Sequence, residues 1–151
     1  MSGVKVIIEN KKARFDYQVL DTLEAGIQLM GSEVKSLRNG QVTLKDAYVS
    51  FVQDEAFLQS AHISEYKASS YNNHSPERLR KLLLHREEIE RMQAEVKEQG
   101  LTIIPLKLYF KKGRVKVLLG FAKGKKRGDK REDVKKRDAK KEMAQSLRKS
   151  R

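Results

Sequence analysis

Apolar and polar residues alternate along much of the first 122 residues, and this period of two is typical of strands that bury one face. Over residues 13–19, for example, Phe15, Tyr17 and Val19 fall on one face, with polar residues between them. The alternation resumes over residues 24–30. Further strands are expected over residues 47–52, 56–63, 102–110 and 114–121.

Short polar connections join four of these strands into two predicted hairpins. Residues 53–55 separate the first pair, and residues 111–113 separate the second, where Gly113 supplies the positive φ of a tight turn. Proline has no N–H to donate to a neighbouring strand. Pro105 therefore predicts that the N-terminal half of its strand is an edge or carries a bulge.

Two helical segments interrupt the strands. The first is predicted over residues 33–39, with Ser32 as its N-cap. The second can begin at Pro76, a residue suited to the first helical position, and carries apolar residues at helical spacing up to residue 99. His85 is an equally good start, after an extended segment 82–84, and the sequence leaves the choice open.

Some six strands at short intervals, with helices inserted and no strand-helix-strand rhythm, favour a mainly β fold. We expect a small antiparallel OB-fold-like barrel, the oligonucleotide-binding type, with inserted short helices and a basic C-terminal tail. The longest apolar runs are far too short to span a membrane, and the N-terminus lacks a signal-peptide pattern. A cytoplasmic protein is therefore expected.

The excess positive charge is confined to the C-terminal end. Residues 1–110 hold 15 basic and 15 acidic residues, whereas residues 111–151 hold 18 basic and 5 acidic ones and so carry the whole net charge of +13. From residue 123 onward only 5 of 29 positions are apolar, too few to bury a core. The sequence therefore divides into a body, residues 1–122, and a basic tail, residues 123–151.

The chain lacks the residue patterns of common catalytic and metal sites. It has no cysteine, three histidines without metal-ligand spacing, and no glycine-rich phosphate loop. Four carboxylates, Asp16, Glu24, Glu33 and Asp46, leave one alternative, since gathered in space they would hold a metal for nuclease chemistry. Such carboxylates are more often solvated or paired with lysine, so we expect no enzyme activity, no metal and no other cofactor.

A neutral β body joined to a cationic tail suits a polyanionic partner. The apolar stripe of the tail, within residues 139–147, is narrow and has no aromatic anchor, so nucleic acid is favoured over a membrane surface. Acidic residues early in the tail and basic ones at its end complement the dipole of a helix from about Asp129, and we expect this helix to form against RNA. A flexible tail that only improves solubility is the alternative.

Five motifs closely resemble those of the SmpB, or SsrA-binding protein, family, in the same order and over nearly the whole length. They are NKKA at 10–13, EAGI at 24–27, GSEVKSLR at 31–38, RKLLLH at 80–85 and GKKRGDKR at 124–131. The resemblance implies an oligonucleotide-binding barrel that binds the tRNA-like domain of transfer-messenger RNA (tmRNA, or SsrA RNA) in trans-translation. With EF-Tu and GTP, this family delivers alanyl-tmRNA to stalled ribosomes. Its tail probes the decoding centre and the empty mRNA channel of the small ribosomal subunit, among ribosomal RNA.

The same resemblance implies, motif by motif, which residues bind RNA. For tmRNA these are Asn10, Lys11, Lys12, Tyr17, Glu24, Tyr48 and Leu83. For the ribosome-engaging tail they are Gly124, Lys125, Lys126, Asp129, Lys130, Arg131, Lys135 and Arg137. Without the resemblance, core packing is the favoured role of the two tyrosines and of Leu83.

The chain departs from the family pattern at a few positions. Phe15 stands where the family usually has His, Glu65 stands where it commonly has Pro, and the loop 67–73 and Gly128 also differ. No polar RNA contact is carried over to these positions. A ribosomal or rRNA-assembly protein with the same barrel and tail is the alternative function.

Overall fold

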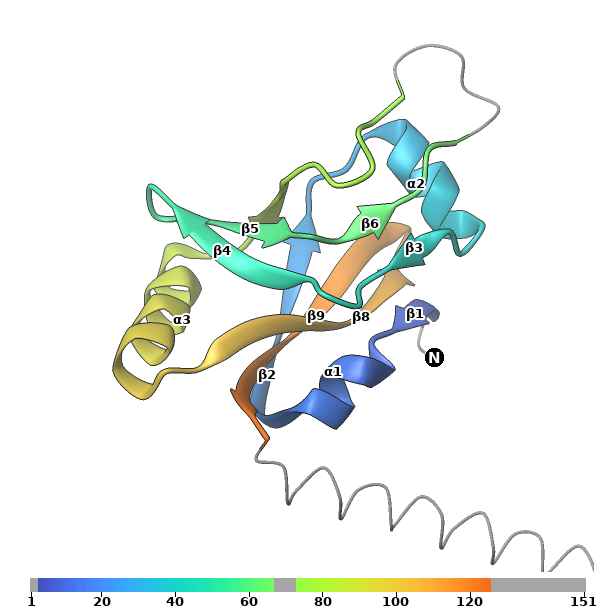
Figure 1. The fold of residues 1–151 in the computed structure, drawn as a ribbon. Coiled ribbons are helices and arrows are strands. Elements are labelled where there is room, and N and C mark those ends of the chain that lie inside the picture. Colours follow the sequence, from blue (N-terminus) through green and yellow to red (C-terminus); the bar gives the residue numbers. More distant parts are fainter. Residues whose placement is uncertain (1–2, 67–72, 126–151) are drawn as a thin grey trace, which may run out of the picture.

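Antiparallel strands form the framework of the structure, a computed structural model that describes residues 3–66 and 73–125 (Figure 1). In chain order the elements are β1 (Val4–Glu9), α1 (Lys11–Asp16), β2 (Tyr17–Ile27), α2 (Gly31–Arg38), β3 (Val42–Thr43), β4 (Tyr48–Val52), β5 (Glu55–Gln59), β6 (His62–Ile63), β7 (Arg80–Leu83), α3 (Arg86–Gln99), β8 (Thr102–Lys111) and β9 (Arg114–Gly124). Seven strands form one antiparallel sheet in the order β1-β8-β9-β2-β7-β5-β4, and β3 pairs with β6. The predicted mainly β antiparallel fold with short inserted helices is confirmed.

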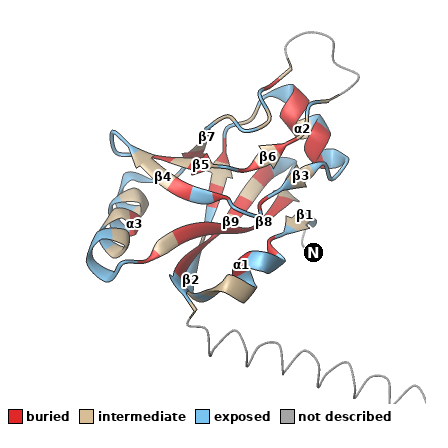
Figure 2. Cartoon of the chain, viewed as in Figure 1, coloured by how far each residue is buried: buried red, intermediate tan, exposed pale blue. Residues whose placement is uncertain are grey.

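The core lies inside this sheet, which curls so that β4 comes back against β8. Figure 2 shows buried positions on the inner faces of the strands and exposed ones on the outer turns of α3. Leu58, Val117, Leu119 and Phe121 are at most 1% exposed, and Met92 of α3, at 0%, packs against them. α3 therefore packs against the core that the curled sheet encloses.

Both predicted hairpins are present. β4 and β5 pair across Gln53 and Asp54, whose φ angles are +49° and +63°. β8 and β9 pair across Lys112 and Gly113, whose φ angles are +52° and +76°. Two consecutive positive φ angles are typical of the tight turns that match strand twist. Glycine adopts them without steric cost, which is why Gly113 marks its turn in the sequence.

The irregularity predicted at Pro105 is confirmed. The register of β8 with β9 shifts between Pro105 and Lys107, which is a β-bulge. On its other side β8 pairs with β1 over residues 107–111, beyond the proline. Pro105 thus sits at a position where no neighbouring strand needs its missing N–H.

The strand predicted over residues 13–19 is wrong in its first half, which is helical, and β2 starts only at Tyr17. The Asn10 side chain begins α1 by accepting a hydrogen bond from the Ala13 N–H at 3.2 Å. Its amide group also donates to the carbonyls of Leu44 and Pro105, each at 3.0 Å. Because these two carbonyls come from distant segments, tertiary contacts decide the conformation here, against the local alternation.

The longer helix follows the later of its two candidate starts. α3 begins after His85, whose N–H donates to the Glu88 carboxylate at 2.8 Å as part of a capping box. Gly100 ends the helix in the left-handed conformation, with φ of +64°. Residues 80–83 form β7 instead, so a helix start at Pro76 is wrong.

α2 is present, but Ser32 does not cap it. The helix begins after Met30, whose N–H donates to Glu33 at 2.8 Å. Ser32 is buried, and its hydroxyl lies 2.9 Å from Nδ1 of His74, whose Nε2 lies 2.8 Å from the Ile63 carbonyl. The carbonyl can only accept, so the His74 Nε2–H donates to it. Ser32 therefore joins α2 to β6.

The ordered strands continue slightly past the predicted end of the body. β9 runs to Gly124, which pairs with Tyr17, and the Lys125 N–H donates to the Asp16 carbonyl at 3.0 Å. Residues 126–151, which form most of the predicted tail, lie outside the described residues. No helix within residues 3–66 and 73–125 is both long and apolar enough to cross a membrane.

Candidate nucleic-acid interface

Six of the seven residues predicted to contact tmRNA lie around two pockets in the surface of the body. The α1 pocket, of about 330 Å³, lies beside α1, and its lining includes Asn10, Lys12, Tyr17 and Tyr48. The β7 pocket, of about 790 Å³, lies beside β7, and its lining includes Glu24 and Leu83. The seventh residue, Lys11, is exposed on α1 but lines neither pocket.

Asn10 belongs to the wall of the α1 pocket. It is 5% exposed, and all of its side-chain hydrogen bonds described above are made within the protein. An amide used in this way holds α1 against two other segments. The structure therefore shows Asn10 positioning the helix that carries Lys11 and Lys12.

The accessible side chains of the α1 pocket are basic and aromatic. Lys12 Nζ lies 3.6 Å from Asp46 Oδ1, but the two side chains are 47% and 76% exposed, so this ion pair is weak. Lys45 lines the same pocket. Tyr48 is 38% exposed, whereas Tyr17 is half-buried against a small apolar cluster. Lysines beside an exposed tyrosine suit RNA, since they offer positive charge to phosphates and a ring to unstacked bases.

Alternate residues of the leucine run in β7 face opposite ways. Leu82 is 1% exposed and Leu83 is 54% exposed, the period of two of a strand. The core position that the residues alone favour for Leu83 is therefore wrong, and it lies at the surface as the family resemblance implies. Leu83 packs over Gly26 of β2, where an added Cβ would stand 3.2 Å from the Leu83 Cβ. Gly26 thus leaves room for this exposed leucine.

Glu24 borders the β7 pocket and is held by two side chains of β8. The Tyr109 hydroxyl donates to Oε2 at 2.5 Å, and Lys111 Nζ lies 3.3 Å and 3.2 Å from Oε1 and Oε2. The bond from Tyr109, helped by Lys111, lowers the pKa of Glu24 below its ordinary value even though desolvation acts to raise it. Burial and the same hydrogen bond raise the pKa of Tyr109. Glu24 is therefore an ionised acceptor beside an apolar side chain.

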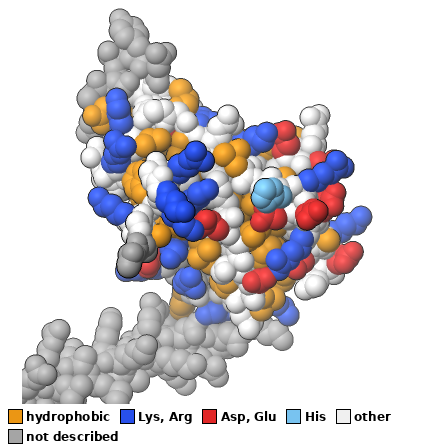
Figure 3. Space-filling view, turned by 180° about the vertical axis from the view of Figure 1, so that it is seen from behind, with side chains coloured by type: hydrophobic (Ala, Val, Ile, Leu, Met, Phe, Trp, Pro, Cys, Tyr) orange, Lys and Arg blue, Asp and Glu red, His pale blue; other side chains and the backbone are white. Residues whose placement is uncertain are grey.

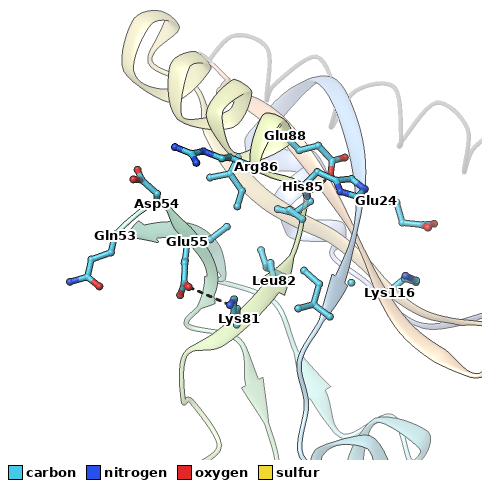
Figure 4. Close-up of a pocket in the computed structure, with 15 residues that line it drawn as sticks. Glu24, Gln53, Asp54, Glu55, Lys81, Leu82, His85, Arg86, Glu88 and Lys116 are labelled. Atoms are coloured by element: carbon cyan, nitrogen blue, oxygen red, sulfur yellow. Dashed lines mark hydrogen bonds and ion pairs between the residues drawn. The ribbon is translucent and has the colours of Figure 1, made fainter.

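The β7 pocket also holds lysines that sequence reasoning missed. Lys116 of β9 lies opposite Gly26 in the sheet, and Lys81 of β7 bonds to Glu55 at 3.3 Å. Figure 4 shows Lys116 on the same side of the pocket as Glu24, with Lys81 and Glu55 on the other. Lysines occur throughout this chain, so no local sequence signal distinguishes Lys81 and Lys116 from the others. Only the register of the strands brings these two to the pocket.

The carboxylates of the nuclease alternative do not come together. Glu33 is buried and bonded to two arginines, Glu24 lines the β7 pocket, and Asp16 and Asp46 line the α1 pocket. Within the described ranges, no three His, Asp or Glu residues form a group able to hold a metal ion. The cluster that this alternative requires is therefore contradicted by the structure.

Two of the residues predicted to engage the ribosome lie in the described part of the chain. Gly124 ends β9, and Lys125 follows it. The remainder lie outside the described residues: Lys126, Asp129, Lys130, Arg131, Lys135 and Arg137.

The two pockets share one surface chemistry. Each places lysines beside an exposed aromatic or apolar side chain, and Figure 3 shows that Lys and Arg gather on part of one face of the molecule. Protein surfaces that bind RNA combine positive charge with groups that pack on bases and ribose. The fold and these pockets define a mainly β domain whose surface chemistry suits nucleic acid.

Comparison with known proteins identifies the family. The sequence profile of the SmpB protein family matches residues 7–149. The SsrA-binding protein of Bdellovibrio bacteriovorus is 60% identical over 149 residues, which covers 99% of this chain and 98% of the relative. That of Syntrophobacter fumaroxidans is 55% identical over 139 residues, covering 92% and 86%. The chain belongs to the SmpB family.

A solved structure agrees with this assignment. It is described as "tmRNA-SmpB: a journey to the center of the bacterial ribosome", and its matching chain is 47% identical with a TM-score of 0.67. The match covers 84% of this chain and 93% of that one. At this identity the likeness extends from the fold to the sequence.

Proposed function

We propose that this chain is a tmRNA-binding protein of trans-translation, whose body binds the tRNA-like domain of tmRNA. The observation that carries the proposal is the 60% identity, over nearly the whole of both chains, to a relative called SsrA-binding protein. The solved tmRNA-SmpB structure supports the setting at the ribosome. The proposal assigns no catalytic step and places the protein in the cytoplasm, where ribosomes work.

In this proposal the body and the tail have separate tasks. The α1 and β7 pockets face tmRNA, and the protein delivers alanyl-tmRNA with EF-Tu and GTP to stalled ribosomes. The basic tail enters the decoding centre and the empty mRNA channel, and becomes helical there. Its excess of Lys and Arg suits a path lined by ribosomal RNA, whose phosphates relieve the repulsion between neighbouring lysines.

A filter-binding titration tests the RNA partner. The full-length chain should bind the tRNA-like domain of tmRNA about tenfold or more tighter than an elongator tRNA at equal salt. Leu83→Ala should weaken binding of the tRNA-like domain by about tenfold, because burying a leucine contributes about 1.5–3 kcal/mol.

Leu79→Ala is the matched control, since Leu79 is 47% exposed but lines neither pocket. It should leave the affinity for both RNAs unchanged. Equal affinity of the wild-type chain for the two RNAs would contradict the proposed function. If Leu83→Ala and Leu79→Ala lose equal affinity for the tRNA-like domain, the β7 pocket has no specific role in RNA binding.

A further inference from the structure

Behind Glu24 stands a buried phenol. Tyr109 is 4% exposed on β8, and the Lys107 ammonium lies 5.4 Å from the centre of its ring. A buried ring cannot swing away from its neighbours, so its hydroxyl has a fixed position. From there it donates to Glu24 Oε2 at 2.5 Å. The carboxylate on the surface is thus oriented by a group that lies beneath the surface.

Lys111 contributes differently to the same carboxylate. Its side chain is 39% exposed, and its ammonium lies 3.2 Å and 3.3 Å from the two Glu24 oxygens, so solvent screens this ion pair and weakens it. A carboxylate has about four lone-pair sites, so Tyr109 and Lys111 leave acceptor capacity on Glu24 unused. The Glu24 side chain is 38% exposed and borders the β7 pocket, where that capacity is accessible.

The chemistry of a carboxylate limits what it can bind on RNA. It repels phosphate, and it can accept hydrogen bonds only from N–H or O–H groups. On RNA these are the amino and imino groups of the bases and the ribose 2′-hydroxyl. The lysines of the pocket, Lys81 and Lys116, remain for the phosphates.

We propose that Tyr109 is a positioning residue, which fixes Glu24 so that its carboxylate accepts a hydrogen bond from a donor group of RNA bound in the β7 pocket. This inference rests on the proposed function and deepens it. It adds a residue that touches no RNA itself, and it states the class of RNA group that Glu24 binds.

The ionisation of Glu24 agrees with this geometry. Around the carboxylate stand Tyr109 and Lys111 of β8, Lys116 of β9, and His85 and Glu88 at the start of α3, which line the same pocket. The hydrogen bond from Tyr109 is the largest influence and lowers the pKa of Glu24. Removal of the Tyr109 hydroxyl should therefore move this pKa upward, toward the ordinary value of glutamate.

The experiment compares Tyr109→Phe, Glu24→Gln and the double variant in the full-length chain, with the tRNA-like domain of tmRNA as the probe. Tyr109→Phe should weaken binding by about tenfold, the effect of losing a hydrogen bond to a charged group. When Glu24→Gln is already present, adding Tyr109→Phe should weaken RNA binding no further. Tyr66→Phe removes a phenol hydroxyl that does not line the β7 pocket and is the matched control, expected to bind as the wild type does.

Two further measurements exclude a merely structural role for Tyr109. Carbon-detected NMR should show a higher titration midpoint for the Glu24 carboxyl in Tyr109→Phe than in the wild type. Glu24→Gln should leave the slope of log affinity against log salt unchanged, whereas Lys12→Gln should reduce it by about 0.7–0.9, the signature of one phosphate contact. Glu24→Asp keeps the negative charge, but the shorter side chain moves the carboxylate away from the Tyr109 hydroxyl. This variant should lose as much affinity for the tRNA-like domain as Tyr109→Phe.

Binding interference by 2′-O-methyl nucleotides distinguishes a ribose 2′-hydroxyl donor from a base N–H donor. Interference at one nucleotide that disappears in Glu24→Gln supports the ribose hydroxyl, and its absence supports a base donor. Additive losses in the double variant, an unchanged Glu24 midpoint, or unchanged affinity of Tyr109→Phe would each overturn the inference. Failure of the proposed function is distinguishable, because it appears as lost preference for tmRNA in the wild-type chain.

Discussion

One buried carboxylate joins α2 to the strand that lines the β7 pocket. Glu33 is 0% exposed, accepts a hydrogen bond from Arg80 Nε at 2.5 Å and also bonds to Arg78. Arg80 is 0% exposed on β7 and donates to the carbonyls of Ala61 and Pro76, both at 2.8 Å. Two guanidinium groups and these carbonyls compensate for the loss of water around the charges. The position of β7 therefore depends on Glu33.

Glu33→Gln should lower the free energy of unfolding by about 3–5 kcal/mol, because Arg78 and Arg80 then lie without a compensating charge. Urea unfolding at pH 7, followed by circular dichroism, measures the loss. Glu77→Gln is the control, since Glu77 is 69% exposed and 3.4 Å from His62, and it should cost less than about 1 kcal/mol. Equal losses would show that the buried network contributes nothing specific.

The same variant should alter the dependence of stability on pH. Burial acts to raise the pKa of Glu33, but the hydrogen bonds from Arg78, the Met30 N–H and Arg80 outweigh it and leave the pKa below its ordinary value. The contribution of Glu33 is therefore complete above the unfolded pKa of about 4.3 and is lost as pH falls through the lower folded value. Glu33→Gln should flatten the stability curve in that acidic range, and an unchanged curve would contradict this.

At the scale of elements, segments governed by their own residues were predictable. The β8–β9 hairpin follows from alternation on both sides of Gly113, and α3 from helical spacing that ends at Gly100. The alternation over residues 13–19 predicts a strand, but residues 11–16 form α1, because carbonyls of distant segments hold the Asn10 side chain that begins this helix. β1 was not predicted, since Val6, Ile7 and Ile8 form a continuous apolar run without alternation.

The candidate site divides in the same way. Motif resemblance led to Glu24 and Leu83, and alternation within β7 explains why Leu83 is exposed while Leu82 is not. Which side chains lie next to Glu24 and Leu83 depends on the register in which the strands pair. Lys116 and Leu83 both lie opposite Gly26, on two different strands, and Tyr109 reaches Glu24 across the sheet. No local pattern contains this information, because it arises only when β2 pairs with β7 and β9 and when β9 pairs with β8.

The turn between β8 and β9 offers a direct test of backbone conformation. Gly113→Ala should lower the free energy of unfolding by about 1–2 kcal/mol, because φ of +76° brings an added Cβ too close to the backbone. Gly31→Ala is the control, since Gly31 starts α2 and an added Cβ there meets nothing within 4 Å. That variant should raise stability by up to about 1 kcal/mol. Thermal unfolding measures both, and equal changes would contradict the turn geometry.

At the scale of the whole molecule, positive charge is divided unevenly between the body and the basic tail. The folded body holds its candidate RNA surfaces in two pockets with mixed charge, where Glu24 and Asp46 stand among lysines. Mixed charge favours recognition of particular groups over general attraction to phosphate. Residues 126–151, in contrast, hold 12 basic and 5 acidic residues and no aromatic side chain, so charge is their main means of binding RNA. Selectivity is thus expected from the body, and affinity for the ribosome from the tail.

Replacing four tail residues by glutamine in the full-length chain separates these contributions. The variant changes Lys130, Arg131, Lys135 and Arg137, and should lose rescue of stalled ribosomes in a reconstituted translation assay. Its affinity for the tRNA-like domain should stay within about twofold of wild type, because the pockets are intact. Its binding to small ribosomal subunits should show a log–log salt slope smaller by about 3, at about 0.7–0.9 per lost phosphate contact.

A body variant with the same loss of charge is the control for this experiment. Lys5, Lys97, Lys112 and Arg114 are exposed and line neither pocket, so their replacement by glutamine should preserve rescue. If both quadruple variants lose rescue equally, total charge determines ribosome binding and the tail has no special place in it. If the tail variant instead loses its preference for tmRNA over elongator tRNA, the selectivity assigned to the body belongs in part to the tail.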